Sequence, residues 1–452
     1  MKRVVHVLFW ISCFLTANIQ FCSVQEQLDA YLQACTDLGY FSGSVLVAKE
    51  GDLLLNKGYG LSNHEHTIAN SSITKFRLSS LSKPFVSLAI MQLQERGLLT
   101  VHDRLSDYIP DYPRGNEITI HHLLTHTSGI KNYATLAEFQ TFKKLPTTII
   151  QLMERFKYLG LASNPGSLYK FSNSNYALLC FIIERVTGQP HYVYINEHIF
   201  KPAGMVNTGY DMQAAIVPGR AAGYTLDTHG LINADYTDIT AAVGLGSFYS
   251  TVEDMYLFNQ TLNTELLACR GSLASMFTPY AQIGDKEDNI MYGYGWATIT
   301  LAGHTVKKHI AGIDGFSTAM YRFADANMFI VVLSNFQHAL TEPLSFDLAA
   351  ILCDQPYEMP VRHVPVVIDT RLHDGYVGGY EYKGLRYTIE QKNGMLFFKQ
   401  PDRDSYQLIP ESETQFFIKG IPILVRFVKD AAGNVTHLVT KAFGKERILH
   451  IS

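Results

Sequence analysis

The sequence is poor in charge for its length. Asp, Glu, Lys and Arg make up 17% of its 452 residues, and no long run of one sign occurs. Lys and Arg total 37 against 41 for Asp and Glu, which gives a formal net charge of −4. Proteins that bind nucleic acid present a basic patch, so we expect no nucleic-acid partner. A hydrophobic fraction of 47% excludes a disordered chain, and the length fits two or three domains.

Long hydrophobic runs are missing except at the start of the chain. Two basic residues precede an apolar stretch over 4–17, and polar residues follow it. This layout is typical of a secretory signal peptide, and the run is shorter than the roughly 20 residues that span a bilayer. We therefore predict a signal peptide over 1–23 and a secreted or periplasmic mature protein without a transmembrane segment. Lipid attachment at Cys22 is an alternative, although Phe21 stands where a small residue should precede such a cysteine.

Cysteine is scarce, with 6 residues in the whole chain. Outside the predicted leader, the four that remain are irregularly spaced and form no Cys-x-x-Cys or Cys/His metal pattern. We therefore expect no metal site. Cys180 stands in an apolar run and is expected to be buried. A bridge between Cys35 and Cys353 is an open alternative for an oxidising compartment.

Strand patterns occur at both ends of the first 350 residues, with a helical pattern between them. A predicted helix over Gln25–Leu38 is followed by two apolar runs, Ser44–Ala48 and Leu53–Leu55, whose Gly-containing turn is typical of a hairpin. The stretch Lys83–Gln260 is mostly helical in pattern. Further strands are predicted over Trp296–Leu301, His304–Ile310, Thr318–Phe323 and Met328–Leu333. The fold class expected is α/β with an antiparallel sheet that the first hairpin joins.

The last 80 or so residues have a different pattern. Three prolines at Pro356, Pro360 and Pro365 mark a linker. Beyond it, short alternating runs separated by turn signals such as Asn393-Gly394 predict a small all-β barrel or sandwich. The predicted strands are Leu385–Glu390, Met395–Lys399, Tyr406–Ile409, Gln415–Lys419, Ile423–Phe427, Val435–Val439 and Arg447–Ile451.

The sharpest chemical motif is Ser80-x-x-Lys83 at the start of a predicted helix. A spacing of three places the two side chains on one helix face. A poorly solvated lysine can lose its proton and act as a base, which would turn the serine hydroxyl into a nucleophile. The alternative is that the motif arises by chance and that Ser79 or Ser80 merely caps a helix.

Other segments extend the motif over most of the chain. These segments are Phe41–Ala48, Ile118–Gly129, Pro165–Tyr176, Gly246–Asp254, Tyr292–Trp296, His309–Phe316 and, near the C-terminus, Tyr376–Tyr380, Leu408–Glu413 and Phe427–Gly433. Together with Ser80–Lys83, they resemble the superfamily of serine β-lactamases and penicillin-binding proteins, in particular its branch of class C β-lactamases, D-alanyl-D-alanine carboxypeptidases and related esterases, with an appended β-barrel. The resemblance implies a β-lactamase/transpeptidase-like domain over 24–356 with a mainly helical subdomain, a linker over 357–371 and a β-barrel over 372–452.

The resemblance also implies roles for individual residues. Ser80 would form the acyl-enzyme and Lys83 would transfer its proton. Asn173 would bind the substrate and the lysine through its amide. His309-Ile310-Ala311 would be the third motif, on a strand that edges the pocket. The backbone N–H groups of Ser80 and Gly312 would form the oxyanion hole.

Three positions depart from the family pattern. Phe171 replaces a motif tyrosine, and loss of a positioned acid or base costs about 10²–10⁴-fold in rate, unless Tyr169 or Tyr176 takes its place. Ala311 replaces a glycine and is expected to crowd the pocket. His309 replaces the lysine that binds a substrate carboxylate, which predicts weaker anion recognition that depends on pH near neutrality.

These observations predict an exported serine hydrolase without a metal or organic cofactor, which acts through a Ser80 acyl-enzyme on amide or ester bonds. The expected partner is a small-molecule or peptide substrate, with D-amino-acid peptides of peptidoglycan type or small esters favoured. The alternative is a penicillin-binding or substrate-binding protein with little turnover, because Phe171 lacks the motif hydroxyl. The sequence leaves the oligomeric state open.

Overall fold

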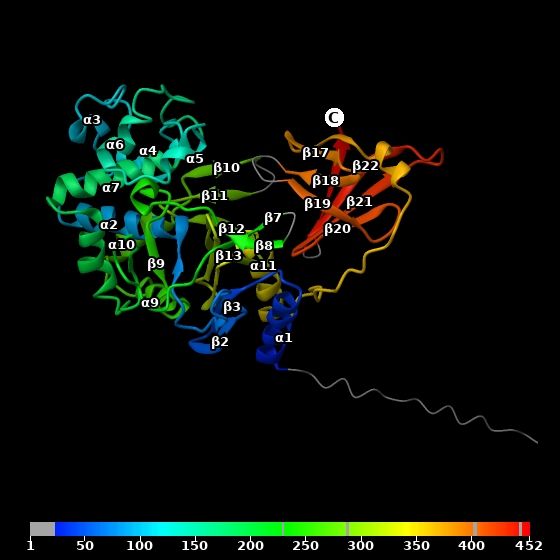
Figure 1. Cartoon of the computed structure of the whole chain (residues 1–452). Helices are drawn as coiled ribbons and strands as arrows, with labels where there is room; N and C mark the ends of the chain where they lie inside the picture. Colours follow the sequence, from blue (N-terminus) through cyan, green and yellow to red (C-terminus); the bar gives the residue numbers. More distant parts are fainter. Residues whose placement is uncertain (1–22, 228–229, 286–288, 401–404, 443–444) are drawn as a thin grey trace, which may run out of the picture.

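The computed structural model describes residues 23–227, 230–285, 289–400, 405–442 and 445–452 (Figure 1). The predicted signal peptide, apart from Ser23, lies outside these residues. Within the described part of the chain, no helix is both long enough and apolar enough to cross a membrane.

The α-helices are distributed over the first 352 residues. They are α1 Val24–Asp37, α2 Lys83–Glu95, α3 Leu105–Tyr108, α4 Ile120–Leu124, α5 Phe139–Phe142, α6 Ile149–Glu154, α7 Asn173–Thr187, α8 His191–Ile195, α9 Val252–Thr261, α10 Arg270–Phe277 and α11 Thr341–Leu352.

The strands before the linker include the main sheet and several short pairs. They are β1 Gly43–Lys49, β2 Asp52–Tyr59, β3 Leu61–Asn63, β4 Ile68–Ala69, β5 Phe76–Arg77, β6 Gly209–Tyr210, β7 Tyr224–Asp227, β8 Gly230–Asn233, β9 Phe248–Ser250, β10 Ala281–Ile283, β11 Ile290–Tyr292, β12 Ala297–Leu301, β13 His304–Ile313, β14 Phe316–Phe323 and β15 Met328–Ser334.

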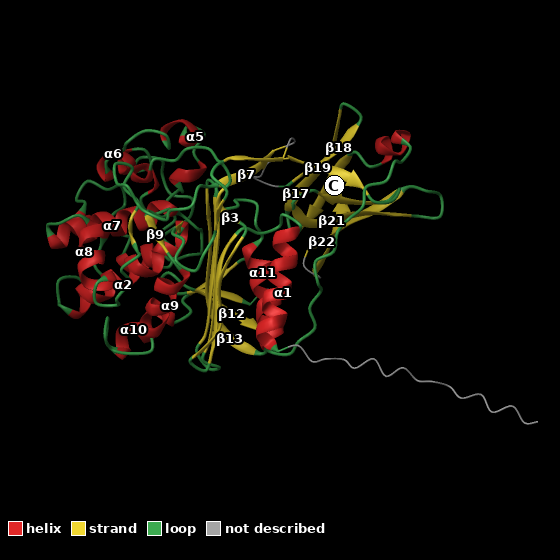
Figure 2. Ribbon diagram, turned by 60° about the horizontal axis from the view of Figure 1, so that its bottom comes forward, coloured by secondary structure: helices red, strands yellow, loops and turns green. Residues whose placement is uncertain are grey.

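An antiparallel eight-stranded sheet forms the centre of the molecule, in the order β10-β11-β12-β13-β14-β15-β1-β2. The first hairpin therefore joins the late strands, as the sequence predicted, with β1 paired to β15 from Gly43↔Ser334 to Lys49↔Met328. Figure 2 shows the sheet edge-on, with α1 and α11 on one face and α2, α7, α9 and α10 on the other. The α/β class with an antiparallel sheet is confirmed.

Alternate residues of each central strand face the two helical layers, because side chains in a strand point to opposite faces. Val45 and Val47 pack in a cluster with residues of α1 and α11. Leu46 belongs instead to the larger cluster formed with the helical region. The central strands are buried on both sides, so they read as continuous apolar runs in the sequence.

Three short strands in and just before the helical middle were not predicted from the sequence. β5, β9 and β6 form a three-stranded sheet in which Arg77 and Gly209 both pair with Tyr249. Strands of two or three residues are too short to show an alternating pattern. This small sheet matters because β5 leads directly into the segment that carries Ser80.

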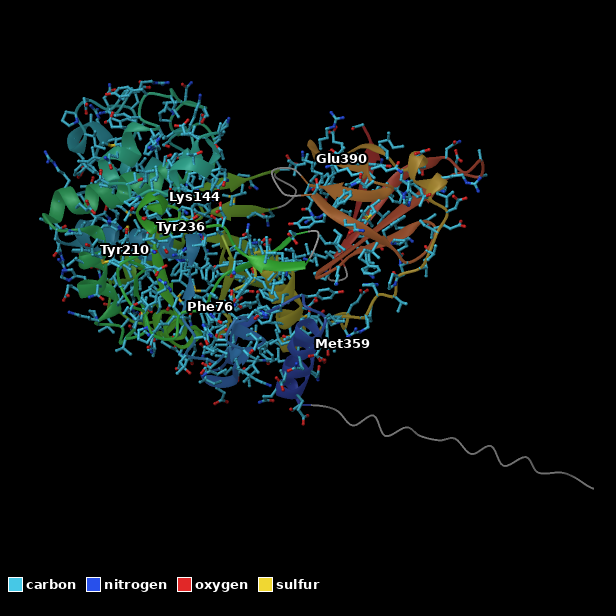
Figure 3. All side chains as sticks on the ribbon, in the orientation of Figure 1. Phe76, Lys144, Tyr210, Tyr236, Met359 and Glu390 are labelled. Carbon is cyan, nitrogen blue, oxygen red and sulfur yellow. The ribbon has the colours of Figure 1, made fainter. Side chains whose placement is uncertain are left out.

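The C-terminal strands close into an eight-stranded barrel. Of the two predicted architectures, barrel or sandwich, the barrel is therefore the one observed. Every predicted run is a strand, but the first barrel strand begins with two glycines and was missed. The strands are β16 Gly378–Tyr382, β17 Leu385–Lys392, β18 Met395–Lys399, β19 Ser405–Pro410, β20 Gln415–Ile418, β21 Ile421–Lys429, β22 Val435–Ala442 and β23 Lys445–Ile451. Met359 lies in the segment that connects α11 to the barrel, and Glu390 lies on β17 (Figure 3).

The barrel packs against the body of the molecule beside α11. The Lys445 ammonium lies 3.7 Å from the centre of the Phe346 ring on that helix. Leu226, from the β7–β8 hairpin, and Leu340 pack against the apolar interior of the barrel. These contacts hold the barrel on the face of the sheet that carries α1 and α11.

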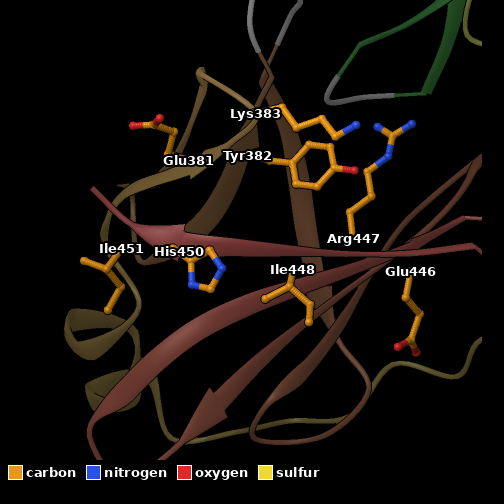
Figure 4. Close-up of a pocket in the computed structure, with 8 residues that line it drawn as sticks. All are labelled: Glu381, Tyr382, Lys383, Glu446, Arg447, Ile448, His450 and Ile451. Atoms are coloured by element: carbon orange, nitrogen blue, oxygen red, sulfur yellow. The ribbon is translucent and has the colours of Figure 1, made fainter. Parts of the chain in front are cut away.

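A cavity of about 550 Å³ lies in the barrel wall, where β23 extends beyond its short pairing with β16 (Figure 4). Tyr382 and Arg447 line it, with the guanidinium 5.9 Å from the centre of the ring. All of its lining residues come from the barrel, so this cavity is separate from the motif around Ser80.

The cysteines of the described chain do not pair, so the suggested Cys35–Cys353 bridge is wrong. Cys35 is fully buried in α1, whereas Cys353 is partly exposed at the end of α11. Cys180 is buried in α7, as predicted.

Candidate active site

The nucleophile motif lies on a turn between strand β5 and helix α2. Residues Ser79–Ser82 form a short 3₁₀ helix, η1, and the α-helix begins at Lys83 with Pro84 in its first turn. Proline is favoured there because its missing N–H would have no helical partner. A 3₁₀ turn places residues i and i+3 on one side. Lys83 Nζ accordingly lies 2.6 Å from Ser80 Oγ, in agreement with the predicted shared face.

Lys83 is almost completely removed from solvent, with 1% of its surface exposed. Burial lowers the pKa of this lysine to about 7, because a charged ammonium loses its hydration there. Within the described residues no carboxylate forms a salt bridge with it. Lys83 is therefore neutral in a substantial fraction of molecules at physiological pH.

The Ser80 hydroxyl has a second hydrogen-bond partner besides the lysine. Its Oγ lies 2.9 Å from the carbonyl oxygen of Leu245, which accepts the serine proton. A protonated Lys83 donates to Ser80 Oγ, and the serine proton then points to Leu245. A neutral Lys83 offers a lone pair to which the same proton can turn. Loss of the lysine proton would thus leave a base beside the serine hydroxyl.

Asn173 completes the polar group around the lysine. It is the first residue of α7, is buried, and accepts a hydrogen bond from Lys83 Nζ at 2.9 Å through Oδ1. Its backbone N–H donates to Asn132 Oδ1 at 3.1 Å, which fixes the start of the helix. The structure therefore brings Ser80, Lys83 and Asn173 together, although they are up to 93 positions apart in sequence.

Strand β13 carries the third motif along the helical face of the sheet. His309 is buried, and its Nδ1 lies 2.7 Å from the carbonyl oxygen of Gly295, which requires an Nδ1–H donor. Burial, with Lys83 nearby, lowers the pKa of His309 to about 3. The expectation of a histidine that titrates near neutrality is therefore wrong. Ala311 is half-buried against the core of the helical region, and Gly312 is exposed.

The sequence around this site matches a known protein family. A family model described as Beta-lactamase matches residues 28–350, which is most of the chain. The chain belongs to the beta-lactamase family. It is accordingly a serine hydrolase of that family.

Individual relatives extend the similarity over almost the whole chain. Penicillin-binding protein 4* of Bacillus subtilis (strain 168) is 29% identical over 432 residues, covering 90% of this chain and 95% of the relative. The octameric penicillin-binding protein homologue from Pyrococcus abyssi superimposes with a TM-score of 0.67 at 23% identity, covering 94% of this chain and 99% of that chain. The D-amino acid amidase from Ochrobactrum anthropi SV3, complexed with L-phenylalanine amide, gives a TM-score of 0.64 at 19% identity over 73% of this chain and 99% of that chain. The two structural similarities show a shared fold.

In this member of the beta-lactamase family, Phe171 lies beside Lys83 and has 44% of its surface exposed. The centre of its ring lies 5.2 Å from Lys83 Nζ. The face of the Tyr176 ring lies 5.4 Å from the same atom, but the Tyr176 hydroxyl donates to the Leu124 carbonyl oxygen at 3.0 Å. The Tyr169 ring packs against Tyr292 at 5.5 Å. Neither tyrosine is hydrogen-bonded to Ser80 or Lys83 within the described chain, so neither replaces the missing hydroxyl in this conformation.

Two further residues support this site. His126 is fully buried, and its Nδ1 accepts a hydrogen bond from the Ser172 backbone N–H at 3.3 Å. It thereby supports the segment that leads into Asn173. Leu245 contributes its backbone carbonyl oxygen, which accepts the hydrogen bond from the Ser80 hydroxyl. No side-chain pattern could reveal a backbone acceptor, whereas the neighbouring glycines at 244 and 246 were the available signal.

Proposed function

We propose that this chain is an exported serine hydrolase that acts through an acyl-enzyme on Ser80. The observation that carries the proposal is the 2.6 Å contact between Lys83 Nζ and Ser80 Oγ, together with a lysine pKa of about 7. A base whose pKa lies near the working pH is unprotonated in part of the molecules and is still basic enough to accept a proton from the serine. Residues 24–356 would form the hydrolase unit and 372–452 an appended barrel.

Acylation begins when neutral Lys83 takes the Ser80 proton and Oγ attacks the substrate carbonyl carbon. The oxyanion that forms accepts hydrogen bonds from the backbone N–H groups of Ser80 and Gly312. When the tetrahedral intermediate collapses, the leaving group takes the proton from Lys83. In deacylation, Lys83 takes a proton from the attacking water and returns it to Ser80. Because Phe171 has no hydroxyl, one lysine serves every proton transfer.

We propose amides and esters as substrates, with D-amino-acid peptides of peptidoglycan type or small esters in first place. The relatives named penicillin-binding protein and D-amino acid amidase support this class. A neutral His309 supports it further, since that position lacks the cation with which β-lactamases hold a substrate carboxylate.

A second candidate is a penicillin-binding protein that acylates but turns over slowly. The exposed phenyl ring of Phe171 beside Lys83 favours it, because no hydroxyl at this position can assist the attack of water.

Intact-mass analysis of the purified mature protein tests both candidates. The protein is exposed to a fluorescent penicillin and to an activated ester, with Ser80→Ala as the control. A Ser80-dependent adduct is expected, and its rate of decay separates a hydrolase from a slow penicillin-binding protein. Absence of an adduct with either probe would remove the acyl-enzyme proposal.

A further inference from the structure

Ser79, the residue before the proposed nucleophile, has an unusual backbone conformation. Its φ is +53°, in the left-handed region that disfavours any residue with a Cβ and that glycine adopts freely. Its side chain is almost fully buried, with 1% of the residue exposed. Glycine would adopt this φ without strain. The serine therefore indicates that its hydroxyl has a role of its own.

The Ser79 hydroxyl connects the nucleophile turn to the third-motif strand. Its Oγ donates to the carbonyl oxygen of Gly312 at 2.7 Å, across 233 positions of sequence. Gly312 lies near the end of β13, and its N–H is one of the two proposed oxyanion donors. The other donor, the N–H of Ser80, belongs to the peptide bond that Ser79 itself forms. The Ser79 hydroxyl therefore links the peptide bond that carries the Ser80 N–H to Gly312, which carries the other N–H donor.

The other sides of the turn are held by close packing and backbone contacts. A Cβ added to Gly246 would lie 1.9 Å from the Ser79 carbonyl oxygen, so the Gly246 backbone packs directly against Ser79. Leu78 donates its N–H to the Phe248 carbonyl oxygen at 2.9 Å, and its own carbonyl accepts from Thr318 Oγ1 at 3.1 Å. These contacts hold the turn against β9 and β14. The Ser79 hydroxyl supplies the connection to β13.

We propose that Ser79 is a positioning residue that sets the spacing between the oxyanion donors at Ser80 and Gly312. This inference rests on the proposed acyl-enzyme function. The oxyanion hole stabilises charge only where its donors lie at hydrogen-bond distance from the developing oxyanion, so a small shift of β13 lowers the rates of acylation and deacylation. Keeping the hydroxyl at this position requires a residue with a Cβ, and the left-handed φ of Ser79 is strained for such a residue.

A pair of substitutions separates the hydroxyl from the backbone. Ser79→Gly removes the hydroxyl and relieves the left-handed strain, whereas Ser79→Ala removes the hydroxyl and keeps the strain. We expect both variants to acylate with an activated ester at least about tenfold more slowly than the wild type. We also expect the glycine variant to unfold at a clearly higher temperature than the alanine variant. Activity would then follow the hydroxyl, and stability would follow the backbone.

Ser82 offers a matched control in the same turn. It is buried, and its Oγ has no hydrogen-bond partner among the described residues. Ser82→Ala should keep the acylation rate within about twofold of wild type, since it removes no hydrogen bond. If Ser79→Gly keeps the wild-type rate, or if the rates of the two Ser79 variants follow their unfolding temperatures, the positioning role is wrong. If the wild type shows no Ser80-dependent acylation, the proposed function itself has failed, which is a different result.

Discussion

Lys83 Nζ lies 2.6 Å from Ser80 Oγ, and only 1% of the surface of this lysine is exposed. The same atom donates to Asn173 Oδ1 at 2.9 Å. A buried ammonium with two uncharged partners is poorly compensated for its lost hydration, and its pKa falls to about 7. The first three predictions below follow from that relationship.

The rate of Ser80 acylation should rise with pH through an inflection near pH 7. In the proposed mechanism the neutral lysine is the base, and its folded-state pKa is about 7. Second-order rate constants for an activated ester, measured from pH 5 to 9, would check this. His309→Gln should leave the inflection in place, because the pKa of His309 is about 3. A rate that still rises about tenfold per pH unit up to pH 9 would contradict a desolvated base, because the usual lysine pKa is about 10.4.

Asn173→Asp should raise the pH of that inflection and slow the reaction at neutral pH. A carboxylate in place of the amide, 2.9 Å from Lys83 Nζ, favours the charged lysine and raises its pKa. The same pH profile measures the shift. Asn173→Ala serves as the control, since it removes the hydrogen bond without adding charge. Equal inflections in the two variants would show that the carboxylate does not reach the lysine.

Lys83→Met should abolish acylation. It should also raise the free energy of unfolding at pH 6 by a few kcal/mol, because it removes a buried charge. Each unit by which folding lowers the lysine pKa corresponds to about 1.4 kcal/mol. The folded-state pKa lies below the unfolded value, so the charged lysine destabilises the fold most at pH below about 7. The gain should therefore shrink as the pH rises from 7 towards 10. Denaturant unfolding of both proteins at pH 6 and pH 9 measures it. A gain independent of pH would show that packing, and not charge burial, is responsible.

Phe171→Tyr should speed deacylation by about 10–100-fold. The substitution adds a hydroxyl to a ring whose centre lies 5.2 Å from Lys83 Nζ, where it can share the proton transfers. Decay of the acyl adduct, followed by intact mass, measures the effect. Phe171→Leu is the control that changes the ring without adding a hydroxyl. An unchanged rate for the tyrosine variant would mean that another group already performs this transfer.

Much of the fold was predictable because its signals are local. Two apolar runs with a Gly-containing turn predicted the hairpin of β1 and β2, strand-like patterns predicted β12 to β15, and alternating runs predicted seven of the barrel strands. β16 was missed because Gly378 and Gly379 give no apolar alternation. The short strands β5, β6 and β9 were missed because their pairing depends on partners far away in the sequence.

The sequence by itself determined which groups the proposed chemistry can use: a serine three residues before a lysine, an asparagine, a histidine in place of a third-motif lysine and a phenylalanine without the motif hydroxyl. Only the tertiary structure decided how that chemistry is tuned. It buried Lys83 and His309 and thereby lowered both pKa values, turned the Tyr176 hydroxyl to Leu124, and joined Ser79 to Gly312. The physical reason is that desolvation and hydrogen bonding depend on neighbours that folding brings together, whereas residue type and spacing are properties of the chain.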